Sequence, residues 1–303
     1  MSNVLIRCMQ GIGDQIYSRP FIRRASLQGD DVYVRTTLPE LYRDLNVKLV
    51  DPGSSTYRTQ RRAYDSSASL YEFNPPQIFN RYIDYHYGNK ELKLNGIVSH
   101  MEQAFGFTPA PILDLNLPRF TRELSKQVDE LIADRPLERI AIVRPVTQRR
   151  EWYCETRSPE PRYIGWCARM LRDAGYYVIS IADCEPEEEW IEGDEPPAHL
   201  KLHHGELGIY GTLELIKRAT VVVGGSGFII PASVAAGVNL FVIFGGRGEY
   251  DNPHKVFDLR MNLTKIGWAL PDHFCRCNKM VHTCDKTIST LDDQFFRFMS
   301  NVR

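Results

Sequence analysis

Val221-Val222-Val223-Gly224-Gly225-Ser226-Gly227 is the stretch of the sequence that says most about the fold. The three valines predict a buried strand, and the small residues after them predict a tight turn. An apolar helix over 230–236 and a second buried strand, Leu240–Phe244, come next. A strand, a turn, a helix and a further strand form the repeating unit of an α/β fold with a parallel sheet.

Short β-branched runs and helical stretches alternate over the rest of the chain as well. In the first half, this pattern predicts strands over Val4–Cys8, Asp31–Arg35 and Val47–Val50, and helices over Gln15–Leu27, Leu38–Leu45, Asn95–Phe105 and Thr121–Asp134. In the second half, it predicts strands over Arg139–Val143, Tyr177–Ile181 and Thr220–Val223, and helices over Arg162–Ala174 and Thr212–Arg218.

A boundary between two units is predicted near 134–138. Asp134-Arg135-Pro136 interrupts the helix that begins at Thr121, and a new series of strands starts at Arg139. A chain of 303 residues also fits two domains of ordinary size better than one. We therefore expect an α/β protein with two facing Rossmann-like domains, over 1–135 and 136–303, and a cleft between them.

Composition excludes several classes of protein. The chain has 37 basic and 38 acidic residues, a formal charge of −1, and 43% apolar residues. This balance argues against a disordered or collagen-like chain and against a large electrostatic surface for duplex DNA. No apolar run is long enough to span a bilayer and no secretory signal is visible, so we expect a cytoplasmic protein. The seven scattered cysteines predict reduced thiols rather than a disulfide framework.

Gly11-Ile12-Gly13-Asp14 follows the first predicted strand directly. Glycines at a strand-to-helix turn let the backbone approach a ligand, and the N-terminus of the helix favours an anion. The third glycine of a dinucleotide-binding fingerprint is missing, because Tyr17 and Ser18 occupy that region, so a nicotinamide cofactor is poorly supported. Asp14 has two interpretations, the N-cap of the helix or a carboxylate that accepts a proton from a substrate hydroxyl.

The turn Gly224–Gly227 predicts a phosphate site. Backbone N–H groups between a strand and a helix suit a diphosphate, and three glycines with a serine exceed what a simple turn needs. A turn that only permits helix–sheet packing is the alternative. The lysine of a P-loop is absent, so hydrolysis of a nucleoside triphosphate is not indicated.

Four arginines follow the first strand of the second half: Arg144, Arg149, Arg150 and Arg157. Loops at the carboxyl ends of strands are where α/β sheets bind ligands, and the planar guanidinium suits phosphate. Trp152 and Tyr153 lie among these arginines. The alternatives are therefore a grip on a nucleic-acid backbone and a solvated basic loop.

Two other stretches fit the α/β pattern poorly, and the C-terminal tail is a further candidate site. Tyr57–Tyr87 is interpreted either as an insertion that shapes an acceptor site or as a surface excursion packed by its own rings. The acidic run Glu185–Glu195 is expected to form a solvated loop or the start of a helix. In the C-terminal tail, buried reduced thiols are the main interpretation and a zinc site is the minor one, for His273, Cys275, Cys277, His282 and Cys284.

Taken together, these features resemble family 9 of the GT-B glycosyltransferases, which includes the ADP-heptose:lipopolysaccharide heptosyltransferases. Gly13-Asp14 and Pro20 are similar to the G-D-x-x-x-x-x-P opening of the family. In the second half, the correspondences are the arginine-rich loop before Trp152, the turn at Gly225–Gly227 and the strand end Phe244-Gly245-Gly246. The cysteines of the tail are similar to a cysteine-containing segment near the end of many members.

The resemblance implies inverting transfer of a sugar from a nucleotide-sugar donor. The first domain would bind most of the acceptor, a saccharide, and the family's catalytic base falls on Asp14. The second domain would bind the donor without an obligatory metal or other cofactor. The residues expected to bind the donor are Gly13, Arg144, Arg149, Arg150, Arg157, Gly224, Gly225, Ser226, Gly227, Gly245 and Gly246.

Two alternatives remain open from the sequence. The chain has Gly225 and Ile229-Ile230 where members of the family commonly carry an acidic residue and a histidine, so a non-catalytic nucleotide-sugar-binding protein is one alternative. The other is a viral-type glycosyltransferase that acts on hydroxymethylated pyrimidines in DNA. It predicts salt-sensitive DNA binding and a basic acceptor face that includes Arg58, Arg61, Arg62 and Arg81.

Overall fold

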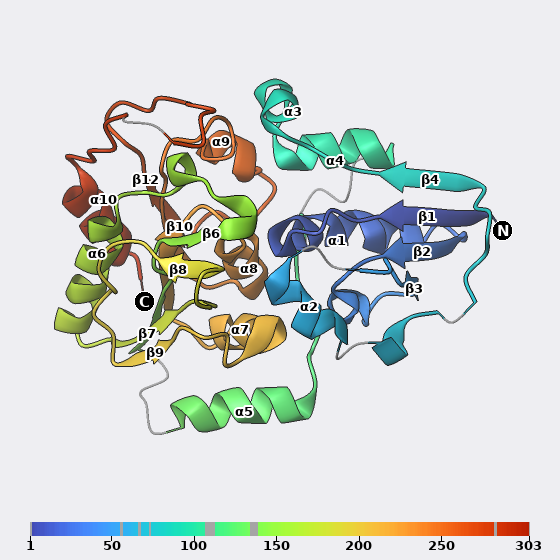
Figure 1. Cartoon of the computed structure of the whole chain (residues 1–303), viewed down its shortest axis with the longest axis horizontal. Helices are drawn as coiled ribbons and strands as arrows, with labels where there is room; N and C mark the ends of the chain where they lie inside the picture. The colour runs from blue at the N-terminus through green and yellow to red at the C-terminus, as the bar shows by residue number, and fades with distance from the viewer. Residues whose placement is uncertain are drawn as a thin grey trace.

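The computed structural model describes residues 2–54, 57–65, 68–72, 74–106, 113–133, 139–281 and 284–302. Two parallel sheets organise this part of the chain, one built from its first half and one from its second (Figure 1). The fold is therefore of the α/β class, as the sequence predicts. The predicted boundary at 134–138 lies outside the described residues.

The first sheet has four parallel strands in the order β3-β2-β1-β4. Their bounds are Asn3–Arg7 for β1, Asp31–Arg35 for β2, Lys48–Val50 for β3 and Arg81–Asp84 for β4. Helices α1, α4, α2 and α3 belong to the same half, with bounds Ile12–Ser26, Ile97–Phe105, Arg58–Asp65 and Asn89–Leu94. Helix α1 packs against α4, and Phe21 and Phe105 meet between them.

The second sheet has six parallel strands in the order β12-β11-β10-β5-β7-β9. Their bounds are Ile140–Val143 for β5, Tyr177–Ile181 for β7, Leu200–Leu202 for β9, Val221–Gly225 for β10, Asn239–Ile243 for β11 and Ile266–Ala269 for β12. Counted from β5 along the chain, this is the doubly wound order 3-2-1-4-5-6 of the Rossmann fold. A short antiparallel pair, β6 (Thr147–Arg149) with β8 (Glu189–Ile191), lies outside the sheet.

Helices cover the second sheet and join it to the first half. α6 (Pro161–Asp173) and α10 (Leu291–Met299) pack on one face, in a core with Ile164, Leu171 and Phe295. α7 (Gly208–Ile216) and α8 (Ile229–Ala236) also pack against helices of the first half. α8 contacts α1, and α7 contacts both α2 and α5 (Arg122–Ile132) (Figure 1). The short α9 (Pro253–Val256) contacts α4.

Each sheet has a topological switch point, where successive connections along the chain run to opposite sides of the sheet. It lies between β1 and β4 in the first sheet and between β5 and β10 in the second. Loops that leave the carboxyl ends of strands on either side of such a switch point diverge and leave a crevice, where α/β sheets bind their ligands. The loop after β1 ends at Gly11, the first turn of α1 carries Gly13 and Asp14, and the loop after β5 begins with Arg144. The topology therefore places the predicted functional residues at the two positions best suited to bind a ligand.

Two segments differ from the sequence predictions. Tyr57–Tyr87 contains α2 and the edge strand β4, and Tyr85 and Tyr87 at its end are buried. The rings of Tyr64 and Tyr71 lie 5.9 Å apart, so packing by its own rings describes only part of this segment. The acidic run Glu185–Glu195 contains β8. Residues 186–187 and 193–195 form exposed loop on either side of this strand, as expected. Glu189 within the strand is only 2% exposed and pairs with Arg58 and Arg149, so a solvated loop describes only part of the run.

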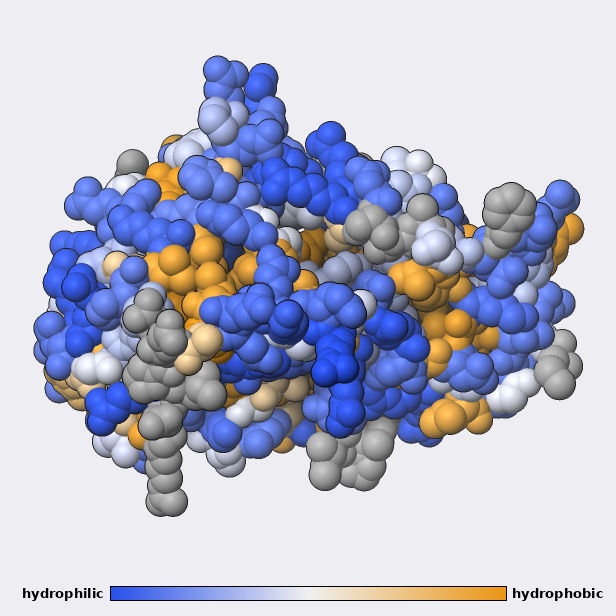
Figure 2. All heavy atoms as spheres, turned by 90° about the horizontal axis from the view of Figure 1, so that it is seen from below, coloured by the Kyte–Doolittle hydropathy of each residue, from blue (hydrophilic) through white to orange (hydrophobic). Residues whose placement is uncertain are grey.

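No helix among the described residues is long and apolar enough to cross a membrane. On the face shown in Figure 2, hydrophilic residues dominate and apolar side chains form separate patches. All seven cysteines are free thiols, which confirms the prediction of a chain without a disulfide framework. In the tail, however, Cys275 and Cys284 are exposed, so the expected burial of these thiols is wrong.

Candidate active site

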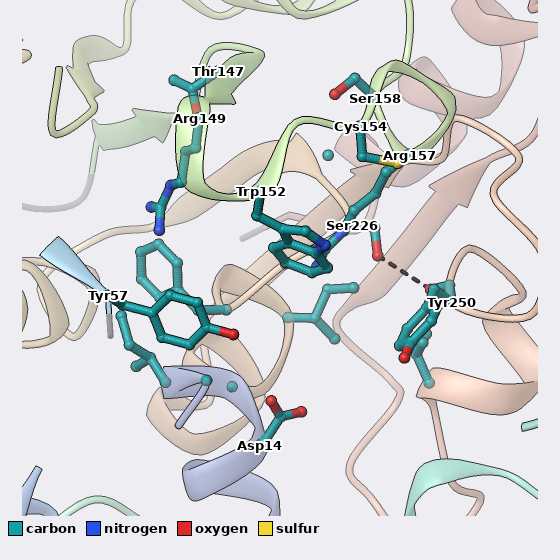
Figure 3. A pocket seen from close by; sticks show the side chains of 18 of the residues that line it. Asp14, Tyr57, Thr147, Arg149, Trp152, Cys154, Arg157, Ser158, Ser226 and Tyr250 are labelled. Atoms are coloured by element: carbon teal, nitrogen blue, oxygen red, sulfur yellow. Dashed lines mark hydrogen bonds between the residues drawn. The ribbon is translucent and has the colours of Figure 1, made fainter. Parts of the chain in front are cut away.

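A cavity of about 430 Å³ lies at the carboxyl ends of the strands beside both switch points. The first half lines it with Gly13, Asp14, Tyr57 and Tyr87, among others, and we call this side the acidic wall. The second half lines it with residues that we call the basic wall, including Arg144, Arg149, Arg157, Gly225, Ser226 and Gly227. Figure 3 shows Asp14 directed into the cavity, opposite the loop that carries Trp152 and Arg157.

Asp14 is not the N-cap of its helix. α1 begins at Ile12, Gly11 is the N-cap, and no side chain caps the first turn. The Asp14 carboxylate instead accepts a hydrogen bond from the hydroxyl of Tyr87, and a Cβ on Gly11 would overlap that carboxylate. Burial raises the pKa of Asp14, while the hydrogen bond from Tyr87 and the charge of Arg157 oppose the rise. The carboxylate is thus held inside the cavity as a candidate proton acceptor.

The basic wall contains arginines that no carboxylate neutralises. Within the described part of the chain, neither Arg144 nor Arg157 has a carboxylate oxygen within 4.0 Å, whereas the Arg149 Nε lies 2.9 Å from Glu189 Oε2. Burial, together with the nearby charges of Arg149 and Arg157, lowers the pKa of Arg144 to about 10. Positive charges that repel one another in a buried cavity favour an anionic ligand.

Aromatic rings hold these arginines instead of carboxylates. The Arg157 guanidinium lies 4.7 Å from the centroid of the Trp152 ring, and that of Arg144 lies 5.6 Å from the Phe228 ring. Stacking on a ring face fixes a guanidinium without neutralising it. The fork of Arg157 therefore stays available to a phosphate.

The turn between β10 and α8 completes the basic wall. Gly225, Ser226 and Gly227 line the cavity. In the first turn of α8, the Ile230 amide donates to the Gly227 carbonyl at 3.1 Å and Pro231 has no N–H, so the candidate donors to an anion are the amides of the turn itself. The Ser226 hydroxyl donates to the carbonyl of Tyr250 at 3.2 Å, so its side chain anchors the turn (Figure 3). Across the cavity, a Cβ on Gly13 would lie 3.3 Å from Pro231, so this glycine lets α1 approach α8 closely.

Four of the residues predicted to bind the donor do not line the cavity. Arg150 has an exposed side chain that pairs with Glu188. Gly224 lies beneath Ile229, and a Cβ there would clash with that side chain. A Cβ on Gly245 would overlap the backbone carbonyls of Arg157 and Ser158, and Gly246 has φ +112°. Of these glycines, Gly245 packs against the loop that carries Arg157, Gly224 packs against Ile229 and Arg144, and Gly246 packs against the C-terminal tail at Cys275.

Sequence reasoning missed several aromatic residues of the cavity. Tyr87 contacts the Asp14 carboxylate, and Tyr57, Trp152 and Tyr250 line the cavity around it (Figure 3). The tyrosine-rich composition of Tyr57–Tyr87 was a signal for two of them. Behind the basic wall, the buried Asp251 accepts hydrogen bonds from the amides of Gly246 and Arg247, each at 2.8 Å.

An ion cluster joins the two halves beside the cavity. Arg58 of α2 reaches the acidic run of the second half, with nitrogens 3.1 Å from Asp183, 3.0 Å from Glu185 and 3.2 Å from Glu189. Arg62 lies 3.6 Å from Asp183, and Arg81 donates to the carbonyl of Phe105 at 2.8 Å. Three of the four arginines on which the DNA alternative rests are therefore engaged within the protein, and that alternative is not supported.

Among the described residues, no group of three or more histidine, cysteine, aspartate or glutamate side chains is arranged to hold a metal ion. His282, one of the residues of the zinc interpretation, lies outside the described residues. The thiol of Cys275 instead donates to the carbonyl of Gly246 at 3.6 Å. The tail therefore packs against the strand end behind the basic wall.

Comparison with known proteins supports the resemblance at the level of the fold. No protein-family model matches the sequence, and a search of curated proteins found no match. Among solved structures, E. coli ADP-heptose lipopolysaccharide heptosyltransferase II is 13% identical, with a TM-score of 0.57 over 99% of this chain and 97% of that chain. A family 9 glycosyl transferase from Veillonella parvula is 10% identical, with a TM-score of 0.60 over 99% and 97%.

A third similar structure, E. coli heptosyltransferase WaaC, was solved with ADP-2-deoxy-2-fluoro heptose. It is 12% identical, with a TM-score of 0.55 over 97% of this chain and 99% of that chain. At such identities the likeness establishes the fold. The chain has the fold of the family 9 heptosyltransferases, over nearly its whole length.

Proposed function

We propose that this chain is a GT-B glycosyltransferase that transfers a sugar from a nucleoside-diphosphate donor to an acceptor hydroxyl with inversion. Residues 1–135 would form the acceptor domain, residues 136–303 the donor domain, and the cavity the cleft between them. The observation that carries the proposal is a single cavity in which the half-buried carboxylate of Asp14 faces Arg144 and Arg157, two arginines that have no carboxylate partner among the described residues. The shared fold of the heptosyltransferases supports it.

The donor would lie on the basic wall. Its diphosphate would bind the amides of the turn at Gly225–Gly227 and the guanidinium groups of Arg144 and Arg157. A side chamber of about 60 Å³ at the end of β7 shares Arg144 and Arg149 with the main cavity. We assign this chamber to part of the nucleoside.

The acceptor, a saccharide in this proposal, would lie on the acidic wall. Its hydroxyl oxygen forms a bond to the anomeric carbon of the donor sugar while the bond from that carbon to the diphosphate oxygen breaks. Asp14 takes the hydroxyl proton, and the diphosphate leaves with the bonding electron pair. Attack opposite the leaving group inverts the anomeric centre. Arg144, Arg157 and the turn amides stabilise the charge that grows on the diphosphate, and on this basis we predict that no metal is needed.

Release of nucleoside diphosphate tests the proposal. ADP-heptose is the first donor to assay, because WaaC was solved with an analogue of it, and mass spectrometry of nucleotides that copurify with the chain selects further donors. We expect release to accelerate when a saccharide acceptor is added. A chain that binds such a nucleotide but never releases it from any donor, with or without acceptor, would support the non-catalytic alternative instead.

A further inference from the structure

Tyr87 and Asp14 are 73 residues apart in the sequence but meet at the switch point of the first sheet. β1 leads into the turn before Asp14, and its neighbour β4 leads into Tyr87. The Tyr87 hydroxyl donates a hydrogen bond to Asp14 Oδ1. Among the described residues, no other side chain donates to this carboxylate, so Oδ2 is left for a substrate proton.

The surroundings fix Tyr87 in this position. Its side chain is 2% exposed, and its ring lies 6.0 Å from that of His100 in an edge-on arrangement. The hydroxyl of Tyr250, from the other half of the chain, donates to the Tyr87 carbonyl at 3.2 Å. A buried ring held on several sides keeps one rotamer, so its hydroxyl stays directed at Asp14.

We propose that Tyr87 is the positioning residue of the catalytic base: its hydroxyl holds Oδ1 of Asp14 so that Oδ2 faces the acceptor, and it stabilises the ionised carboxylate. This inference rests on the proposed function. It assigns to the tyrosine-rich segment a role in the chemistry, beyond shaping the acceptor site.

The electrostatics of the site give Tyr87 a role that packing alone would not. Burial and the Asp14 charge raise the pKa of Tyr87 well above its usual value, so the phenol remains a hydrogen-bond donor at all working pH values. A hydrogen bond to the ionised form of an acid lowers its pKa. The other titratable or charged groups near Asp14 are Tyr17 on its own helix and, from elsewhere, Tyr57, His86, Arg157 and Tyr250.

The test compares Tyr87→Phe with Tyr85→Phe. Tyr85 is the matched control, because its side chain is also 2% exposed, it lies two residues away and it does not line the cavity. The Asp14 pKa is measured by NMR on protein with ¹³C-labelled aspartate carboxyls, and Asp14→Asn identifies the signal. We expect Tyr87→Phe to raise this pKa by roughly one unit, since one hydrogen bond is lost, and Tyr85→Phe to leave it unchanged.

The pH dependence of turnover provides the second readout. In Tyr87→Phe, the fall in kcat on the acid side should move to higher pH by the same amount, with the KM for the donor nearly unchanged. An unchanged Asp14 pKa, or an unchanged pH profile in an active variant, would overturn the role of Tyr87. If the wild-type chain turns over no nucleotide-sugar, the proposed function fails, and with it the catalytic part of this inference. The NMR shift then still decides whether Tyr87 holds the carboxylate.

Discussion

The acidic and basic walls of the cavity are built on the same plan and carry opposite charge. Each has a strand at the switch point of its sheet, glycines where the strand gives way to a helix, and the helix itself: β1, Gly11 with Gly13, and α1 on one side, β10, Gly225 with Gly227, and α8 on the other. On the first wall the glycine is followed by Asp14, which Tyr87 holds. On the second it is followed by Phe228, whose ring supports Arg144. In the proposed function, one architecture would supply a proton acceptor on the first wall and an anion site on the second.

The largest expected difference between the two walls is the effect of substituting Asp14 on turnover. Asp14→Asn keeps the size of the side chain but removes the proton acceptor, so kcat should fall about 10³-fold, within the range for loss of general-base catalysis. The affinity for ADP, measured by calorimetry, should change less than about twofold, because the proposed diphosphate site lies on the other wall. A variant that keeps its turnover would remove Asp14 from the mechanism.

The second largest effect is expected at the ion cluster that joins the two halves beside the cavity. Glu189 is 2% exposed and pairs with both Arg58 and Arg149, so Glu189→Gln leaves buried charges without their partner. We expect it to lower the free energy of unfolding by about 3 kcal/mol in denaturant titrations. The control Glu185→Gln, at a side chain that is 45% exposed, should change it by less than about 0.5 kcal/mol. Equal effects would mean that the cluster acts as an ordinary surface network.

Asp251, a buried acid behind the basic wall, is expected to make the free energy of unfolding depend on pH. Burial raises the pKa of Asp251 to about 6, although amides donate to it. An acid whose folded-state pKa lies above its unfolded value binds its proton more tightly when folded. Its contribution to stability is therefore largest below about pH 4 and falls as the pH rises through about 6.

Asp251→Asn should remove this part of the pH dependence. The free energy of unfolding of the wild type relative to the variant should fall by about 2 kcal/mol between pH 4 and pH 7, by thermal or chemical denaturation. Parallel stability curves for the two proteins would show that the Asp251 carboxyl titrates as it does in the unfolded chain.

The smallest effect is expected at single arginines of the basic wall. Arg157→Ala should weaken ADP binding about tenfold, which is the low end for a hydrogen bond to a charged group, because Arg144 and the turn amides remain. Arg150→Ala is the matched control, since Arg150 lies in the same loop but points to solvent. Identical affinities for the two variants would place the diphosphate away from Arg157.

Local sequence patterns predicted many of the strands and helices, because these elements depend mainly on residues that are neighbours in the sequence. The β-branched runs predicted β2 and β7 at their observed bounds. The observed helix α8 begins at Ile229, one residue before the predicted start. β4 was missed because it is short and at the edge, with only Ile83 of its four residues buried. Helix α7 begins earlier than predicted, at Gly208.

Long-range pairs could not be predicted in the same way. Arg58 and Glu189 are 131 residues apart, and Asp14 and Tyr87 meet only because β4 pairs with β1. The first contact depends on how α2 packs against the second half, and the second depends on strand order; one sequence reveals neither. For the same reason Asp14 fitted an N-cap as well as a base, and Gly245 fitted the ligand surface although it supports the Arg157 loop.

A crystal structure of the chain with ADP tests the division between the two walls most directly. The account predicts that the diphosphate oxygens accept hydrogen bonds from Arg157 and from the amides of 225–227, while the Asp14 carboxylate touches no phosphate. Phosphates bound on the side of Asp14, or outside the cavity altogether, would contradict it.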